Sequence, residues 1–396
     1  MENGIENRQD SSGAGRVIVK PAVFVSRADI EHYSVALRHL MVGLGVQSSP
    51  AALVCPANAK SKAVLCPSVE LVCHPLFRIP VFRTQNRMEV MDKLSKFKPK
   101  ILHCFSPKKE KITAYVSEQL SLPYIVSVNN LKAHYSRSFL CGENCGGVIC
   151  SSEGVAEKVR KHYANCQERI VQVNMGAFAE DEAACFSNEG QVTSIVLADE
   201  LESVSQFESL LNAVRHLAID GFEFMLAIIG EGRASNQIRE MIKSRGLGNI
   251  VTLIGSISPI RSVFKGADIF VQLDESEFGE SYLLDAMGVG LCVASSNHNK
   301  SDLIVEDKTA VLFDPHDELS VYTTLKRLLN AREFARKIAA NGQEHIRSNH
   351  SVSTMTDKII EAYRDAQKRY KTLKKAKSEN GNDKKGDSSD DQTSKP

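Results

Sequence analysis

Short apolar runs alternate with helical patterns along most of the chain. Strand-length apolar runs such as 17–25 and 101–105 are separated by segments such as 30–44, in which apolar residues recur every three or four positions. Continuous apolar strands alternating with helices are typical of parallel sheets that helices cover on both faces. The pattern predicts a doubly wound α/β domain, which we place over residues 16–180.

A second alternation follows a polar, irregular stretch at residues 181–191, which we interpret as an interdomain linker. The apolar runs at 193–198 and 222–229 are predicted strands, and the segment 207–217 between them has its leucines and Val214 at helical spacing. A second Rossmann-like α/β domain is therefore predicted over residues 192–350.

The two ends of the chain are polar. Residues 1–15 are rich in Gly and Ser, and residues 371–396 are rich in Lys, Asp and Ser, so both are expected to be disordered. Residues 351–370 between them and the second domain have the pattern of one long helix. The basic start of the tail is compatible with an anionic lipid surface or an acidic partner, although a solubilising tail is the simpler interpretation.

The stretch 265–294 holds the most informative chemistry. An apolar run, a polar turn, a helical pattern and a second apolar run follow one another, which predicts a βαβ unit of a parallel sheet. Its turn lies at the carboxyl edge of the sheet, where open α/β sheets bind ligands. Glu277 and Asp285 frame this turn and helix, and carboxylates accept hydrogen bonds from sugar hydroxyls. Backbone N–H groups at 279–281 would suit a phosphate. An ordinary βαβ unit with solvated acids is the alternative.

The sequence EFGESYLLDAMGVGLCVA, from Glu277 to Ala294, resembles the donor-site signature of GT-B glycosyltransferases, especially the retaining group called family 4. That signature is approximately E-x-F-G-x-x-x-x-E-A-M-A-x-G-x-P-V-V. The acid pair keeps the family spacing, but Phe-Gly lies one place early, the second acid is Asp, and Cys292 replaces the usual Pro. The segments KPKILHCFSP, LPYIVSV, CGGVICSSEGVAEKVRKHY and VQVNMGAF follow the order of the family's first domain.

The resemblance implies two Rossmann-like domains facing a cleft, with the helix at 351–370 crossing back to the first domain. It implies transfer of a sugar from a nucleoside-diphosphate sugar to a glycan or lipid-linked acceptor, with retention and without a metal or other cofactor. By this resemblance Glu277 binds donor-sugar hydroxyls and Asp285 binds ribose hydroxyls. The remaining donor-side residues would be Gly230, Gly232, Arg233, Lys265, Phe278, Gly279, Glu280 and Ser281, and the acceptor-side residues His103 and Asn129. A structural role explains His103 equally well.

Two cations of the family are missing. The family carries an Arg and a Lys in a segment like G-R-l-x-x-x-K-G, whereas Asp199-Glu200 and Ser205-Gln206 stand in those places here. Acids repel a diphosphate. Arg233, Lys265 and Lys300 are placed near the expected cleft by the topology and are candidate replacements for the missing cations. The alternative is that they are ordinary surface charges. The alternative function is therefore a catalytically degenerate GT-B protein that binds a glycan, a nucleotide or a partner enzyme. Another GT-B activity, such as an epimerase or a phosphorylase, is a third possibility.

Composition limits the classes of protein to which this chain can belong. The 396 residues are 42% hydrophobic with a net charge of +1, which gives no support for a dedicated nucleic-acid binder. No apolar run reaches the ~18–20 residues that span a bilayer, and the first residues lack the apolar core of a signal peptide. We therefore expect a cytoplasmic protein, or one peripheral on the inner face of a membrane. The ten cysteines are interpreted as small buried residues, because the spacing of Cys141, Cys145 and Cys150 is not a strong zinc pattern.

Overall fold

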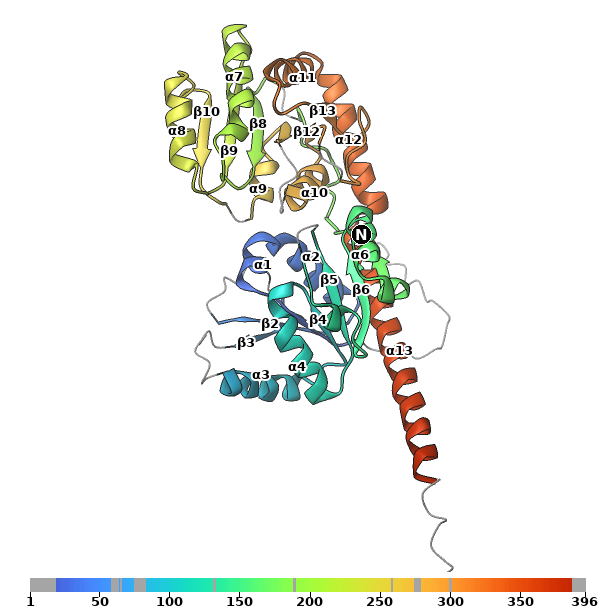
Figure 1. Cartoon of the computed structure of the whole chain (residues 1–396). Coiled ribbons are helices and arrows are strands. Elements are labelled where there is room, and N and C mark those ends of the chain that lie inside the picture. The colour runs from blue at the N-terminus through green and yellow to red at the C-terminus, as the bar shows by residue number, and fades with distance from the viewer. Residues whose placement is uncertain are drawn as a thin grey trace, which may run out of the picture.

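Two parallel sheets, one in each half of the chain, form the core of the molecule (Figure 1). The computed structural model describes residues 19–57, 64, 66–74, 83–130, 133–187, 190–257, 259–273, 279–298 and 301–386. Residues 1–15, for which disorder is expected, lie outside these ranges.

The first sheet has seven parallel strands in the order β3-β2-β1-β4-β5-β6-β7. The order reverses between β1 and β4, which places a topological switch point at their carboxyl ends. The strands are β1 (Pro21–Phe24), β2 (Ala51–Pro56), β3 (Val69–His74), β4 (Ile101–Cys104), β5 (Tyr124–Val128), β6 (Cys145–Cys150) and β7 (Ile170–Gln172). Its α-helices are α1 (Arg27–His32), α2 (Ser34–Val46), α3 (Arg83–Phe97), α4 (Glu110–Leu120), α5 (Arg137–Leu140) and α6 (Glu153–His162), with 3-10 helices at Pro107–Lys109 and Ala164–Arg169.

The second sheet has six parallel strands in the order β10-β9-β8-β11-β12-β13, with its switch point between β8 and β11. The strands are β8 (Thr193–Ala198), β9 (Phe224–Ile229), β10 (Val251–Ile254), β11 (Ile269–Gln272), β12 (Cys292–Ser296) and β13 (Val311–Phe313). The helices are α7 (Ser205–Ile219), α8 (Ser235–Ser244), α9 (Arg261–Phe264), α10 (Gly279–Val289), α11 (Glu318–Asn330) and α12 (Arg332–Asn349). The predicted α/β class with two doubly wound sheets is confirmed.

The apolar patterns become buried surfaces as expected. Strands β1, β2, β4, β5, β6, β11 and β12 are buried along their whole length, because helices cover both faces of a parallel sheet. In α7 the predicted apolar stripe, which includes Leu210, Leu211 and Leu217, packs into the core of the second domain. The carboxyl ends of both sheets point toward the space between the domains (Figure 1).

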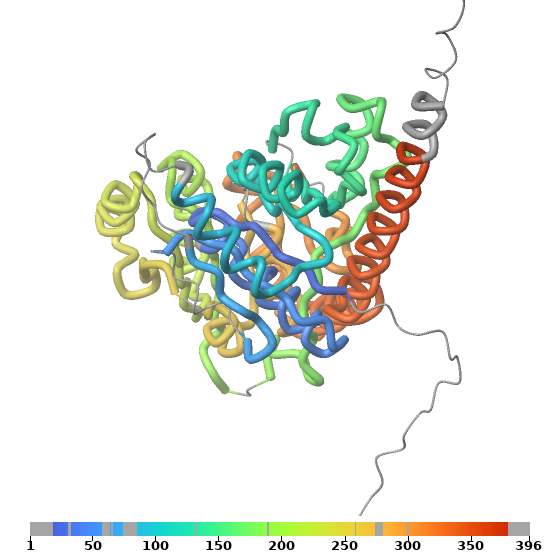
Figure 2. Tube along the Cα trace, turned by 90° about the horizontal axis from the view of Figure 1, so that it is seen from below, coloured from blue at the N-terminus to red at the C-terminus, as the bar shows by residue number. Residues whose placement is uncertain are grey.

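Helix α13 (Val352–Gly386) crosses back onto the first domain, as predicted. It packs closely on β6, since a Cβ on Gly146 would lie 2.3 Å from the Cβ of Ala366. Figure 2 shows α13 along one side of the molecule. The chain also passes between the domains at Ala177, which pairs with Ser351 just before α13. Two segments far apart in the sequence therefore connect the domains side by side.

The structure corrects the prediction of disorder from residue 371. Helix α13 continues to Gly386, and the side chains of 371–378 are exposed. Lys and Ala favour helix, and the packed half of α13 already supplies the costly first turns. None of the helices in the described part of the chain has the length and apolar character that crossing a membrane requires.

Candidate functional site: the interdomain cleft and helix α10

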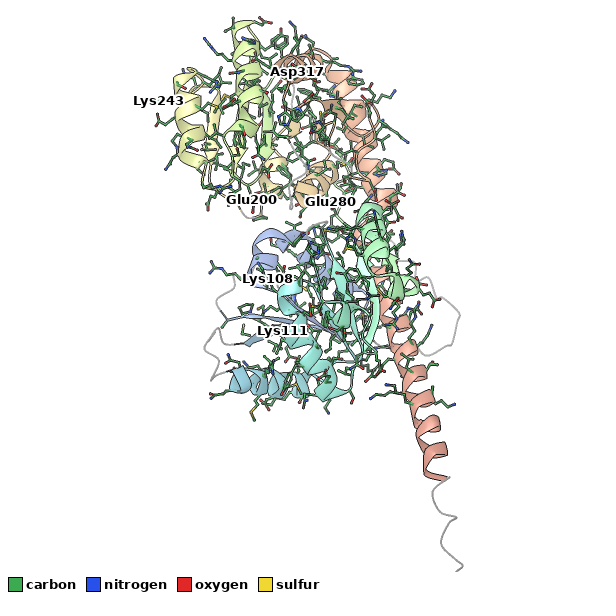
Figure 3. The ribbon with its side chains drawn as sticks, in the orientation of Figure 1. Lys108, Lys111, Glu200, Lys243, Glu280 and Asp317 are labelled. Carbon is green, nitrogen blue, oxygen red and sulfur yellow. The ribbon has the colours of Figure 1, made fainter. Side chains whose placement is uncertain are left out.

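A cavity of about 510 Å³ opens where the first sheet faces the second domain. The ends of β1, β4 and β5 supply most of its wall, and Glu200 reaches it from the loop after β8. Figure 3 places Glu200 and Glu280 on the side of the second domain that faces the first, and Lys108 on the upper part of the first domain. The cavity is lined by Ala28, Asp29, Tyr33, Phe105, Ser106, Pro107, Lys108, Ser127, Asn129, Asn130, Ala133, His134 and Glu200.

The first-domain wall of this cavity is a fixed set of polar groups. Ser26 and Asp29 form a capping box at α1, and the Ser106 hydroxyl donates to the same Asp29 carboxylate at 2.6 Å. The Asn129 side chain donates to the Phe105 carbonyl at 3.1 Å and lies in the wall of the cavity. Its predicted acceptor-side role stays a prediction. Such preset donors and acceptors suit a hydroxyl-rich ligand.

His103 does not reach this cavity. It is fully buried, with Nδ1 2.7 Å from the Tyr363 hydroxyl of α13 and Nε2 2.7 Å from the Ser127 hydroxyl of β5. Burial lowers its pKa to about 3, so the imidazole is neutral. The structure thus gives His103 a structural role, tying α13 to the first sheet, in place of the predicted acceptor-side role.

The loop Gly230–Gly232 has a steric reason for its glycines. A Cβ on Gly230 would lie 1.9 Å from the Asp199 carbonyl oxygen, and a Cβ on Gly232 would lie 2.3 Å from that of Leu201. The two loops are also hydrogen-bonded, from Leu201 N to the Glu231 carbonyl at 3.2 Å. Both glycines therefore let the loop after β8 pack against this turn, whether or not a nucleotide binds there.

Helix α10 begins at Gly279, on the cleft side of the second domain (Figure 1). Glu277 and Phe278 lie outside the described residues. Glu280 is half-buried in the first turn and Ser281 is buried. The neighbouring Tyr282 has a raised pKa, because it is buried and because Asp199 and Glu200 are close enough to disfavour its anion. The helix start therefore faces acids, at the side where the family has cations.

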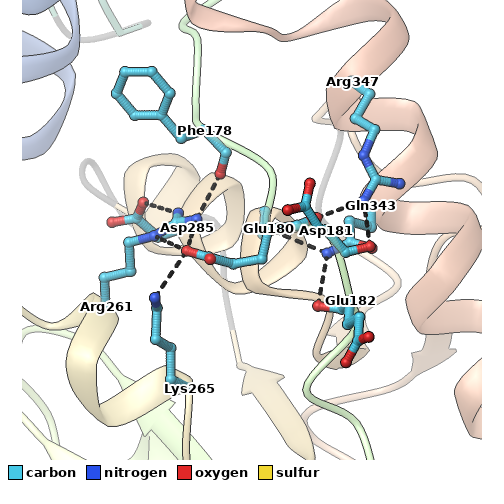
Figure 4. A network of polar contacts seen from close by, with 10 residues as sticks. Phe178, Glu180, Asp181, Glu182, Arg261, Lys265, Asp285, Gln343 and Arg347 are labelled. Carbon is cyan, nitrogen blue, oxygen red and sulfur yellow. Dashed lines mark hydrogen bonds and ion pairs between the residues drawn. The ribbon is translucent and has the colours of Figure 1, made fainter. Parts of the chain in front are cut away.

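Asp285 lies deep in this helix and is fully buried. Its Oδ1 accepts a hydrogen bond from Nη1 of Arg261 at 3.2 Å, whereas its Oδ2 has no partner among the described residues (Figure 4). Burial raises the pKa of Asp285 to about 6, although Arg261 opposes the shift. Asp285 is thus a buried acid that is held on one oxygen only.

Arg261 also binds the segment that joins the domains (Figure 4). Its Nη2 donates to the Phe178 carbonyl at 2.7 Å and to Glu180 Oε1 at 2.9 Å, and Lys265 Nζ lies 3.1 Å from the same Glu180 oxygen. Hydrogen bonds from Arg261 and Lys265 hold the pKa of Glu180 below its usual value. No sequence pattern predicts this cluster, because Glu180 and Arg261 are far apart in the chain and belong to no motif.

Two of the three predicted substitute cations are paired with carboxylates. Lys265 is bound to Glu180, and the largely exposed Arg233 lies 2.9 Å from Glu202. Lys300 lies outside the described residues. Within the described ranges, no three His, Cys, Asp or Glu side chains are arranged to hold a metal ion.

Comparison with known proteins adds to this geometry. Residues 185–345 match the family model described as glycosyl transferases group 1. A glycosyltransferase from Rickettsia africae superposes with a TM-score of 0.71 over 88% of this chain and 98% of its own, at 14% identity. The chain has the GT-B fold, and its second domain is similar to glycosyl transferases group 1.

Two further structures share this GT-B fold. Anabaena HepE, in complex with UDP and glucose, has a TM-score of 0.70 at 13% identity over 87% of this chain and 98% of its own. A sucrose-phosphate synthase from Thermosynechococcus elongatus has a TM-score of 0.65 at 15% identity, over 87% and 98%. No relative is found among curated protein sequences. These neighbours share the fold of this chain, and residues 185–345 carry its similarity to glycosyl transferases group 1.

Proposed function

We propose that this GT-B protein transfers a sugar from a nucleoside-diphosphate sugar to a glycan or lipid-linked acceptor, with retention and without a metal or other cofactor. The observation that carries the proposal is the α10 unit of the group 1 domain. Its helix start faces the cleft, and its buried acid Asp285 has one oxygen without a described partner.

Each side of the cleft has a proposed task. Asp285 would accept hydrogen bonds from the ribose, and Glu277 from the donor sugar. The N–H groups at the start of α10 would face the diphosphate, since a helix N-terminus favours an anion. The polar cavity of the first domain, with Asn129 in its wall, would take the acceptor. The leaving diphosphate carries negative charge that a transferase must stabilise.

Peripheral contact with the inner face of a membrane is part of the same proposal. Helix α13 supports it, because the exposed residues 371–378 include four lysines and no acid. Basic segments are attracted to anionic lipid surfaces. A lipid-linked acceptor would be reached most easily by a protein held at that surface.

A second candidate is a catalytically degenerate GT-B protein that acts as a binding or partner module. It is favoured by Asp199 and Glu200, which stand where the family has cations. The ion pairs that Arg233 and Lys265 make with carboxylates favour it too, since both cations are already neutralised. Such a module would bind a ligand in the cleft without turning over a donor.

Calorimetric titration with UDP, GDP and ADP, and then with their sugar conjugates, tests the first proposal. We expect one nucleotide to bind with a dissociation constant on the order of micromolar, with and without chelator. Asp285→Asn should weaken binding by about tenfold or more, because a hydrogen bond to a charged group contributes ~1.5–3 kcal/mol. Glu277→Ala should act in the same direction.

The matched control is Asp365→Asn, which removes an exposed acid of α13 and should leave nucleotide binding unchanged. A folded wild-type protein that binds none of the nucleotides or their sugars would contradict the proposed donor site. Binding that depends on added Mg²⁺ would contradict the metal-free part of the proposal.

A further inference from the structure

Arg261 joins helix α10 to the segment between the domains. Its guanidinium donates to Asp285 of α10, and also to the Phe178 carbonyl and the Glu180 carboxylate of the connecting segment. The side chain is 18% exposed, so these contacts form largely away from water. Glu180 in turn is fixed on α10, because its N–H donates to the Gly288 carbonyl at 2.8 Å.

The two oxygens of Asp285 have different surroundings. Oδ1 is bound by Arg261, whereas Oδ2 is buried and has no partner among the described residues. A buried acceptor without a hydrogen bond is destabilising, and buried polar atoms in native proteins are nearly always paired. A ligand hydroxyl would satisfy Oδ2 while Arg261 holds the other oxygen and fixes the plane of the carboxylate.

Charge decides how strongly Asp285 can act as an acceptor. Burial favours its neutral form, and the only described cation that opposes burial by direct contact is Arg261. A neutral carboxyl would present an O–H donor on one oxygen and would lose the strength of a charged acceptor. Arg261 therefore controls both the ionisation and the orientation of Asp285.

We propose that Arg261 is a positioning residue for the donor, which keeps Asp285 ionised with Oδ2 free to accept a ribose hydroxyl and which anchors this arrangement to the interdomain segment through Glu180. The inference rests on the proposed function, in which Asp285 binds the nucleotide. It goes beyond that function, because it assigns a role to a residue of α9 and to one of the connecting segment.

Several other charged groups surround this cluster. Lys265, which follows α9, binds Glu180, and Arg347 of α12 donates to the Glu180 and Asp181 carbonyls. His39 of α2 packs against Phe178, and burial lowers its pKa to about 4, so it stays neutral above pH 5.5. Among these described groups, Asp285 is the one whose charge changes near pH 6.

The pH dependence of nucleotide binding tests the proposal. The raised pKa of Asp285 means that its acceptor form is lost as the pH falls through about 6, so wild-type affinity should fall below that pH. Arg261→Gln removes the favourable cation and should move the midpoint up by about one to two units. At pH 7 about half of Asp285 would be ionised if the midpoint is near pH ~7 and about one-tenth if it is near pH ~8, which predicts about twofold to tenfold weaker binding.

A second variant should move the pH midpoint of nucleotide binding in the opposite direction. Glu180→Gln removes the negative charge beside Arg261, which leaves the guanidinium more available to Asp285, so the midpoint should move down. A merely structural role of the cluster would weaken binding in both variants without moving the midpoints in opposite directions. Arg261→Lys should fall between wild type and Arg261→Gln. The matched control is Arg239→Gln, at an exposed arginine of α8, which should change nothing.

A direct titration of the carboxyl keeps the test independent of the ligand. The ¹³C NMR carboxyl resonance of Asp285, assigned by its loss in Asp285→Asn, should titrate near pH 6 in the wild type and higher in Arg261→Lys and Arg261→Gln. Unmoved midpoints in these variants would overturn the inference while leaving the proposed function standing. Failure of the wild type to bind any nucleotide would overturn the proposed function and the ribose part of the inference, and the NMR titration alone would then decide whether Arg261 controls the ionisation of Asp285.

Discussion

Replacing His103 by leucine should lower the free energy of unfolding by about 2–6 kcal/mol. The variant keeps the volume but leaves the hydroxyls of Tyr363 and Ser127 buried without a partner, and each such group costs ~1–3 kcal/mol. Urea denaturation measures the change. The control is His162→Leu, at an exposed site on α6, which should have little effect.

The stability difference at His103 should also depend on pH. The pKa of His103 is lowered to about 3 in the folded protein, whereas the unfolded chain takes up this proton near pH ~6.5. The contribution of neutral His103 is therefore fully present above that pH and is lost as the pH falls from 6.5 toward 3. The free energies of unfolding of wild type and variant should therefore approach each other in acid. Adding Tyr363→Phe and Ser127→Ala to His103→Leu should restore part of the stability, because no buried hydroxyl is then left unpaired. A His103→Leu protein as stable as the wild type would contradict this role.

Substituting Gly230 by alanine should be the most disruptive single-methyl change in the second domain. Its Cβ would lie 1.9 Å from the Asp199 carbonyl oxygen, which is backbone and cannot rotate away. Hydrogen bonds from Asp199 N to Ile229 and from Ala234 N to Leu201 hold the opposing loop in place. Overpacking of this kind costs about 1–3 kcal/mol or more.

Thermal unfolding and nucleotide titration of Gly230→Ala measure this effect on the same protein. The loop after β8 should shift, and with it Glu200 at the cleft, so nucleotide binding should weaken together with stability. Gly154→Ala is the control, because a Cβ there meets nothing within 4 Å and alanine favours the helix. A Gly230→Ala protein with unchanged stability would show that the two loops are not packed as described.

The fold could be predicted because its signal is repeated along the chain. Strand-length apolar runs such as Ile269–Gln272 and helical stripes such as that of α7 are local patterns that tertiary packing reinforced. The low apolar content after residue 370 predicts disorder, whereas α13 continues to Gly386, because a packed helix can extend into solvent once it is nucleated.

The site was only partly predictable, because contacts between distant residues leave no periodic trace. The place of His103 at a strand end suggests the acceptor side, but its partner Tyr363 is 260 positions away. The pair Arg261 and Glu180 is equally invisible in the sequence. A loop motif points to Gly230, whereas its steric role depends on how closely Asp199 approaches. The roles of Glu277 and Phe278 remain predictions from the sequence.

Turnover of a nucleotide sugar tests the account most directly. The nucleotide selected by titration is supplied as its sugar conjugates, and release of the nucleoside diphosphate is followed with wild type, Asp285→Asn and the Asp365→Asn control. We predict release by the wild type and the control that is strongly reduced in Asp285→Asn. Tight binding of the donor with no release from a folded wild-type protein, with or without glycan and lipid-linked acceptors, would contradict sugar transfer and favour the binding module.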